Sequence, residues 1–518
     1  MLPRRFAVAF GSIAMLTTAM VPAVSLAAGY DPASDMNSMY NTTLYTGAQA
    51  WWNAGFTGSG VDVAVIDTGV SPVDALSAPA KLIYGPDLSF ESQSSSLRNL
   101  DTNGHGTFMA GIIAGRGSGA VQGSYAGDSS DFLGVAPDAR VVSLKVGVAD
   151  GGADVSQVIA AIDWVVQHRN DNGMNIRVLN LSYGTDSAQA YTVDPLSFAV
   201  EQAWKAGIFV VTATGNAGYV FKTGTLTNPA FDPKIFAVGA TDSMGTATQG
   251  DDTVALFSST GSNVRTPDVV APGTHIVSLR VPGSYVDQTY GSTGVVTDAL
   301  FRGSGTSEAA AFVSGAAALA IQAHPNITPD SLKRLFLSNT RGLGGFSSLK
   351  QGQGEIDLSK MLGATVYAAP MQWKTIAWSA GIGSLELARG TDHLTRDGVV
   401  LVGEQDIFGH AFNSTAMAAL EAVDASWAGG DWNGNSWSGN SWSGNSWSGN
   451  SWSGNSWSGN SWSGNSWSGN SWSGNSWSGN SWSGNSWSGN SWSGNSWSGN
   501  SWSGNSWSGN SWSGASWS

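Results

Sequence analysis

Three short segments place a carboxylate, an imidazole and a hydroxyl among small residues. They are Asp67-Thr68-Gly69, Gly104-His105-Gly106-Thr107 and Gly305-Thr306-Ser307. Each residue alone has a plain structural explanation, as a turn aspartate, a helix-start histidine or an N-capping serine. Together, however, a carboxylate that orients an imidazole and an imidazole that deprotonates a hydroxyl form the arrangement used for acyl transfer. The conjunction therefore predicts a nucleophilic site built from Asp67, His105 and Ser307.

The elements that must position these residues alternate between two patterns. Five short apolar runs rich in Val and Ile predict strands, at 61–66, 141–146, 178–181, 208–212 and 235–240. Apolar residues between Val155 and Val166 recur at helical spacing, and 198–205 also predicts a helix. Such alternation is typical of an α/β fold whose parallel sheet is flanked by helices on both faces. Asp67 ends the first run, and the carboxyl end of a strand is where open sheets of this kind hold their sites.

The order Asp, His, Ser and the segments around these residues resemble the subtilase family, the subtilisin-like serine proteases of peptidase family S8. The resemblance rests on the strand running into Asp67, on His105-Gly106-Thr107-Phe108-Met109-Ala110-Gly111, and on Gly305-Thr306-Ser307-Glu308-Ala309-Ala310. It implies a three-layer subtilisin-like domain and a secreted serine endopeptidase acting on protein or peptide substrates. In that family Ser307 is the nucleophile, His105 the base and Asp67 its orienter.

The resemblance also implies further site residues. Asn216, in Thr214-Gly215-Asn216-Ala217-Gly218, matches the family's oxyanion-hole asparagine. Ser182, Tyr183 and Gly184 match a segment that pairs with substrate main chain, and Gly151 lies in the segment on the opposite side of the substrate. Two positions depart from the family, because Glu308 and Ala311 stand where Met and Pro are usual. Glu308 puts a carboxylate near the site, where it would affect leaving-side specificity or the pH profile.

Acidic loop residues raise the question of a structural calcium ion. Asp150 and the 115–132 loop, with Asp128 and Asp131, offer oxygen ligands. We favour ordinary solvated loop acids, and we assign no metal ligand. The predicted acyl transfer requires no cofactor.

Composition narrows the class of protein. The 518 residues carry a net charge of −14 and contain no cysteine, which argues against a nucleic-acid partner and excludes disulfides. Arg4 and Arg5 precede an apolar run at 6–24 and small residues at 25–27, as in a signal peptide. We therefore predict a signal peptide at 1–27, secretion to the medium or cell surface, and no transmembrane anchor in the mature chain. A membrane anchor is the alternative for this run.

The rest of the chain divides by composition. After a short segment at 28–45, far shorter than the family's usual propeptide, we expect the peptidase domain at 46–362 and a linker or small β-rich region at 363–430. The end, 431–518, is a low-complexity repeat of Asn-Ser-Trp-Ser-Gly that holds most of the 25 tryptophans. It predicts either a β-solenoid or a disordered, charge-free tail that adheres to cell wall or polysaccharide, and we favour the tail. The competing hypothesis for the whole chain is a non-catalytic surface protein whose subtilase domain is a relic.

Overall fold

A computed structural model describes residues 29–94, 96–219, 224–396, 399–428 and 431–436, with three short strands beyond them. The predicted signal peptide lies outside the described residues, as does most of the repeat. None of the described helices is long and apolar enough to cross a membrane.

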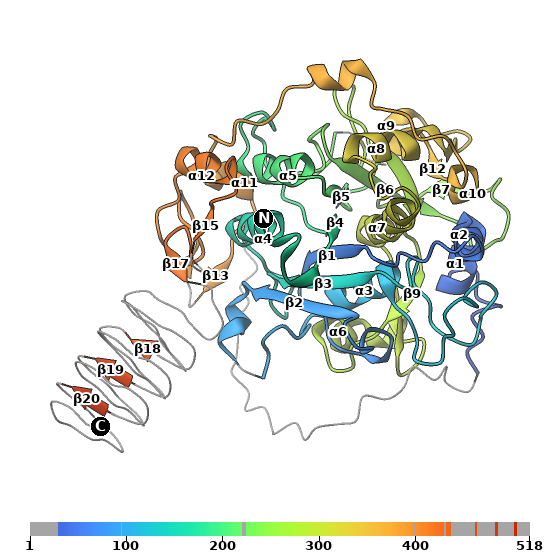
Figure 1. Cartoon of the computed structure of the whole chain (residues 1–518), viewed down its shortest axis with the longest axis horizontal. Helices are drawn as coiled ribbons and strands as arrows, with labels where there is room; N and C mark the ends of the chain where they lie inside the picture. The colour runs from blue at the N-terminus through green and yellow to red at the C-terminus, as the bar shows by residue number, and fades with distance from the viewer. Residues whose placement is uncertain are drawn as a thin grey trace.

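The centre of the molecule is one large sheet (Figure 1). The strand order is β11-β12-β8-β6-β5-β4-β1-β3-β2, with β7 paired to β6. These strands are β1 (Asp62–Asp67), β2 (Leu82–Asp87), β3 (Arg140–Lys145), β4 (Ile176–Leu181), β5 (Phe209–Ala213), β6 (Phe236–Asp242), β7 (Thr253–Val254), β8 (Val269–Pro272), β11 (Thr340–Arg341) and β12 (Glu355–Ile356). The pairs among β2, β3, β1, β4, β5, β6, β8 and β12 are parallel, and only β7 and β11 pair antiparallel. This confirms the predicted α/β fold with a mostly parallel sheet.

Helices cover the sheet in two groups. The helix pair α3 (His105–Ala114) and α7 (Thr306–Ala323) packs together against the sheet, and the pair α4 (Val155–His168) and α5 (Pro195–Lys205) packs together against it as well. The remaining helices are α1 (Met39–Thr46), α2 (Ala48–Asn53), α6 (Tyr285–Gly294), α8 (Pro329–Ser338), α9 (Ser348–Gln351), α10 (Leu358–Met361), α11 (Leu385–Arg389) and α12 (Ser414–Glu421). Every residue of β1 and β5 is buried, which explains their uninterrupted apolar character.

Element boundaries differ from the predicted ones by a few residues, for local reasons. Helix α5 begins at Pro195 rather than at 198, because the Asp194 carboxylate accepts hydrogen bonds from the Leu196 and Ser197 amides. Proline is tolerated there, since the first helical residue needs no amide donor.

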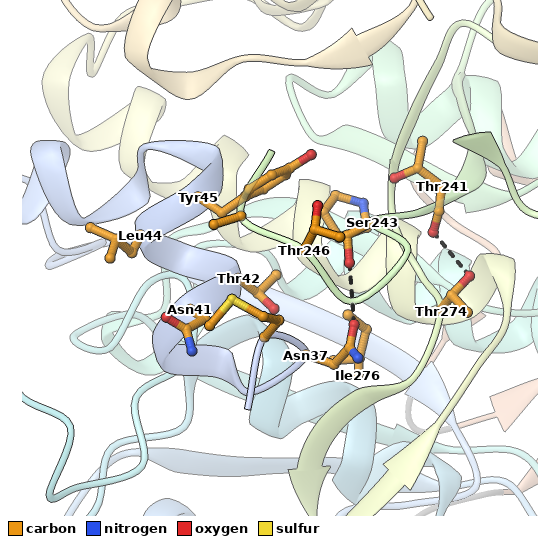
Figure 2. A pocket seen from close by; sticks show the side chains of 13 residues that line it. Asn37, Asn41, Thr42, Leu44, Tyr45, Thr241, Ser243, Thr246, Thr274 and Ile276 are labelled. Atoms are coloured by element: carbon orange, nitrogen blue, oxygen red, sulfur yellow. Dashed lines mark hydrogen bonds between the residues drawn. The ribbon is translucent and has the colours of Figure 1, made fainter. Parts of the chain in front are cut away.

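The segment before the predicted domain start packs on the domain. Asp35 pairs with Arg302 at 2.7 Å, and the Val277 amide donates to the Asn37 carbonyl at 3.1 Å. Figure 2 shows the pocket between this segment and the carboxyl ends of β6 and β8, where Ser243 donates to Asn37 at 3.3 Å. This pocket contains none of the predicted site residues.

The region after the peptidase domain is also anchored. It contains α11, α12 and the short strands β13 (Thr395–Arg396), β14 (Val399–Val400), β15 (Trp427–Ala428), β16 (Asp431–Trp432) and β17 (Asn435–Ser436). Arg389 and Asp154 form a buried ion pair at 2.6 Å, and the Trp432 indole donates to Asp163 on α4. These contacts anchor α11 and β16 against the peptidase domain.

Three short strands are described within the repeat: β18 (Trp462–Ser463), β19 (Trp482–Gly484) and β20 (Trp502–Gly504). They pair in parallel, with Trp462 opposite Trp482 and Trp482 opposite Trp502 (Figure 1). Successive strands are therefore four pentapeptides apart. Both the solenoid and the flexible tail stay predictions, because the rest of the repeat lies outside the described residues.

Candidate active site

Asp67 and His105 meet where a strand ends and a helix begins. Asp67 is the last residue of β1, and His105 is the first of α3. The His105 Nδ1 lies 2.8 Å from the Asp67 Oδ1, which also accepts from the Thr68 amide. The Asp67 side chain is buried, whereas that of His105 is 32% exposed. With Nδ1 held by the carboxylate, Nε2 is the ring nitrogen left for proton transfer.

Glycine makes this approach possible. A Cβ on Gly106 would lie 2.1 Å from the Gly69 carbonyl oxygen, so no larger residue fits between the two loops. Gly104 has a φ of +105°, which other residues rarely adopt. The small residues around Asp67 and His105 are therefore required by the contact itself.

Asp101, which the sequence did not single out, holds the two loops together. One carboxylate oxygen accepts from the Thr68 hydroxyl at 2.8 Å and the Gly104 amide at 2.7 Å, and the other accepts from the Thr107 amide at 2.7 Å. Burial raises the pKa of Asp101 above its ordinary value, and these hydrogen bonds oppose part of that rise. The one sequence feature that could have pointed to Asp101 is its position just before the start of a helix. A carboxylate there interacts favourably with the positive end of the helix dipole.

Ser307 and Asn216 come together at the start of α7. Ser307 is the second residue of this helix and is buried. The Asn216 Oδ1 accepts from the amide and the hydroxyl of Thr306, at 2.9 and 3.0 Å. With its oxygen fixed in this way, the Asn216 Nδ2 lies 3.4 Å from the position of a Cβ on Gly305. An amide donor and the positive end of a helix thus lie beside the main chain that leads into Ser307.

The carboxylate of Glu308 is buried beside the same glycines. Its oxygens lie 2.7 Å from the Cβ positions of Gly303 and Gly305, so a larger residue at either position would displace the carboxylate. Burial raises the pKa of Glu308, and the charge of His105 opposes this. Burial lowers the pKa of His105, but the Asp67 carboxylate outweighs it, and with help from Glu308 raises that pKa to about 9.

The two segments predicted to contact substrate flank this centre. Ser182, Tyr183 and Gly184 follow β4, and the Ser182 hydroxyl donates to the Ser307 carbonyl at 3.4 Å. Within the described structure, the main chain of 182–184 has no hydrogen-bond partner, as an edge open to an added strand requires. Asn103 donates to the Ala149 carbonyl at 2.8 Å and so ties the Gly151 turn to the His105 loop.

The acidic loop residues do not converge. Asp128 accepts from Ser130, Asp131 accepts from the Gly119 amide, and Asp150 accepts from the Gly152 amide. Among the residues with described positions, no group of three or more His, Cys, Asp or Glu is arranged to hold a metal ion. A structural calcium ion stays the untested alternative to solvated loop acids.

Comparison with known proteins identifies what the chain is similar to. The model of the subtilase family matches residues 58–355, which include Asp67, His105, Asn216 and Ser307. Serine protease AprX of Bacillus subtilis (strain 168) is 38% identical over 290 residues, covering 55% of this chain and 62% of AprX. Subtilisin Savinase of Lederbergia lenta is 34% identical over 301 residues, covering 57% of this chain and 89% of that protein. A crystal structure of a cold-adapted subtilisin-like serine proteinase aligns with a TM-score of 0.42 and 29% identity, over 58% of this chain and 88% of that one.

Proposed function

The chain belongs to the subtilase family, and on that premise we propose that it is a secreted serine endopeptidase cleaving peptide bonds within protein or peptide substrates. The observation that carries the proposal is the 2.8 Å contact between His105 and a buried Asp67, at a site shared with the start of α7. Because the chain spans only 62% of AprX, its activity and substrates are inferred from its own site.

The proposed mechanism assigns one role to each residue. His105 Nε2 takes the hydroxyl proton as Ser307 Oγ attacks the scissile carbonyl carbon, and Asp67 stabilises the imidazolium that forms. Asn216 Nδ2 and the Ser307 amide donate to the oxyanion. His105 then gives the proton to the leaving amine, which leaves an acyl-enzyme. Water hydrolyses this ester by the same route in reverse, so no cofactor enters the reaction.

The pH dependence of cleavage tests this proposal. We expect kcat/KM on an internally quenched peptide, blocked at both ends, to rise with pH through a single ionisation near 9. The reason is that only neutral His105 accepts the Ser307 proton, and Asp67 raises its pKa to about 9 after burial has lowered it.

Two results would contradict this account of the pH profile. If kcat/KM did not change between about pH 7 and about pH 9, His105 would be excluded as the titrating base. No internal cleavage at any pH would favour the alternative of a relic domain in a surface protein. As an internal check, Glu308→Gln should move the midpoint to lower pH, because that carboxylate helps to raise the pKa of His105.

We further propose that the repeat attaches the enzyme to a surface polymer such as cell wall or polysaccharide. Support comes from the regular Trp spacing, the absence of charged residues after Asp431, and the parallel register of Trp462, Trp482 and Trp502. Aromatic faces suit flat, weakly polar surfaces such as sugar rings. Secretion is supported by the signal-like composition of residues 1–27.

A chain ending at residue 436 separates attachment from catalysis. We expect it to cleave peptides like the full chain and to lose cosedimentation with insoluble peptidoglycan or cellulose. The described contacts of 385–432 with the peptidase domain are all retained in this variant. Equal sedimentation of the two proteins would refute a polymer-binding role for the repeat.

A further inference from the structure

A pocket lies against His105, and the buried carboxylate of Glu308 forms part of its wall. The strand pair β9 (Ile276–Leu279) and β10 (Leu300–Gly303), the start of α6 and the first turns of α3 and α7 enclose it. Most of the wall is apolar, with side chains from Phe108, Leu279, Val286 and Phe301. A carboxylate in such surroundings is costly unless something pairs with it.

Among the described residues, Glu308 faces a positive charge only from His105, when that imidazole is protonated. It is 6% exposed, and its described hydrogen bond is to its own main-chain amide. The other charges of the pocket cancel, because Arg280 and Asp287 form an ion pair at 2.6 Å. When His105 is neutral, the pocket therefore carries one uncompensated negative charge.

The position of the pocket indicates which part of a substrate enters it. This step rests on the proposed function, in which His105 hands a proton to the leaving amine. The leaving half of the peptide must then lie on the His105 side of Ser307. A pocket walled by both His105 and Glu308 is consequently placed for the first side chain after the scissile bond.

We propose that this pocket is the subsite for the residue after the scissile bond, and that Glu308 makes it selective for arginine or lysine. The apolar wall accommodates the hydrocarbon stem of such a side chain, while the carboxylate binds its charged head. Neutral or acidic side chains would leave Glu308 unpaired. The family usually has Met at this position, so the selectivity belongs to this chain's own residue.

Matched peptides that differ only at this position test the proposal. They carry arginine, its uncharged isostere citrulline, or glutamate after the scissile bond. The kcat/KM of each peptide is measured at a pH above the pKa of His105, where the imidazole is neutral. Arginine remains charged there. The full-length enzyme should prefer arginine to citrulline about tenfold, as expected for one hydrogen bond to a charged group. Glutamate should be the poorest.

Glu308→Gln is the decisive variant, since it removes the charge and keeps the size. In this variant the ratio of kcat/KM for the arginine peptide to that for the citrulline peptide should fall to about one. Asp171→Asn, an exposed carboxylate outside the pocket, should leave the ratio unchanged. Failure to cleave any peptide would refute the proposed function. Cleavage without an arginine preference, or a preference that survives in Glu308→Gln, would refute the subsite.

Discussion

Replacing Ser307 by alanine will lower kcat for peptide hydrolysis by about 10⁶-fold, the loss caused by removing the serine or histidine of subtilisin. The proposed acyl-enzyme forms through the Ser307 oxygen, whereas the neighbouring Thr306 hydroxyl is engaged, because it donates to the Asn216 Oδ1 at 3.0 Å. The residual rate would come from the oxyanion donors and from substrate binding. Initial rates on a quenched peptide measure this loss.

The same substitution should leave the fold intact. No described hydrogen bond involves the Ser307 hydroxyl. The free energy of unfolding, measured by thermal denaturation, should therefore change by no more than about 0.5 kcal/mol. Ser314→Ala, on the same helix, is the matched control. Its hydroxyl bonds Asn180 at 2.9 Å, so its loss should cost about 1 kcal/mol of stability and little activity. A Ser307→Ala enzyme whose kcat stays within about 100-fold of that of the unmodified enzyme would contradict the assignment of Ser307 as the nucleophile.

Removing the amide donor of Asn216 should have the second largest effect. We expect Asn216→Ala to lower kcat by about 10²–10³-fold with little change in KM, the loss found when the equivalent subtilisin donor is removed. The loss falls on kcat because the Nδ2 donor is strengthened only as negative charge develops on the oxyanion. Steady-state kinetics on one peptide separates the two parameters.

Asn216 also accepts two hydrogen bonds from Thr306, so its positioning role needs a control of its own. Asn216→Asp keeps an acceptor for Thr306, loses the donor and adds a negative charge that repels the oxyanion. It should therefore be at least as impaired as Asn216→Ala. An active Asn216→Asp enzyme would mean that the residue acts through Thr306 and not through the oxyanion.

The sequence was a good guide where function depends on local pattern. Asp67 and His105 are predicted as partners by their order and surroundings, and the structure places them in contact. The strand that leads into Asp67 and the strand before the Asn216 loop are also predictable. A sheet covered on both faces requires continuous apolar runs in its strands. Asp101 escaped notice because its partners are two main-chain amides and a hydroxyl, which no residue pattern reveals.

Longer-range arrangements were beyond the sequence. Glu308 stands out as a departure from its family, but the pocket it faces is assembled from α3, α6, β9 and β10. The region after the peptidase domain showed no chemistry in its sequence, yet Arg389 reaches back 235 residues to pair with Asp154. Such contacts depend on how whole elements pack, and charge patterns along the chain do not encode them.

The central claim is that Ser307 is a nucleophile activated by His105 and Asp67, and covalent labelling tests it most directly. The folded full-length protein is treated with a fluorophosphonate at a pH above the pKa of His105, where the imidazole is neutral. The modified residue is then located by peptide mass mapping. The account predicts one adduct per chain, on Ser307, absent from the heat-denatured protein and from Ser307→Ala. An unlabelled native protein, or an adduct on another residue, would contradict it.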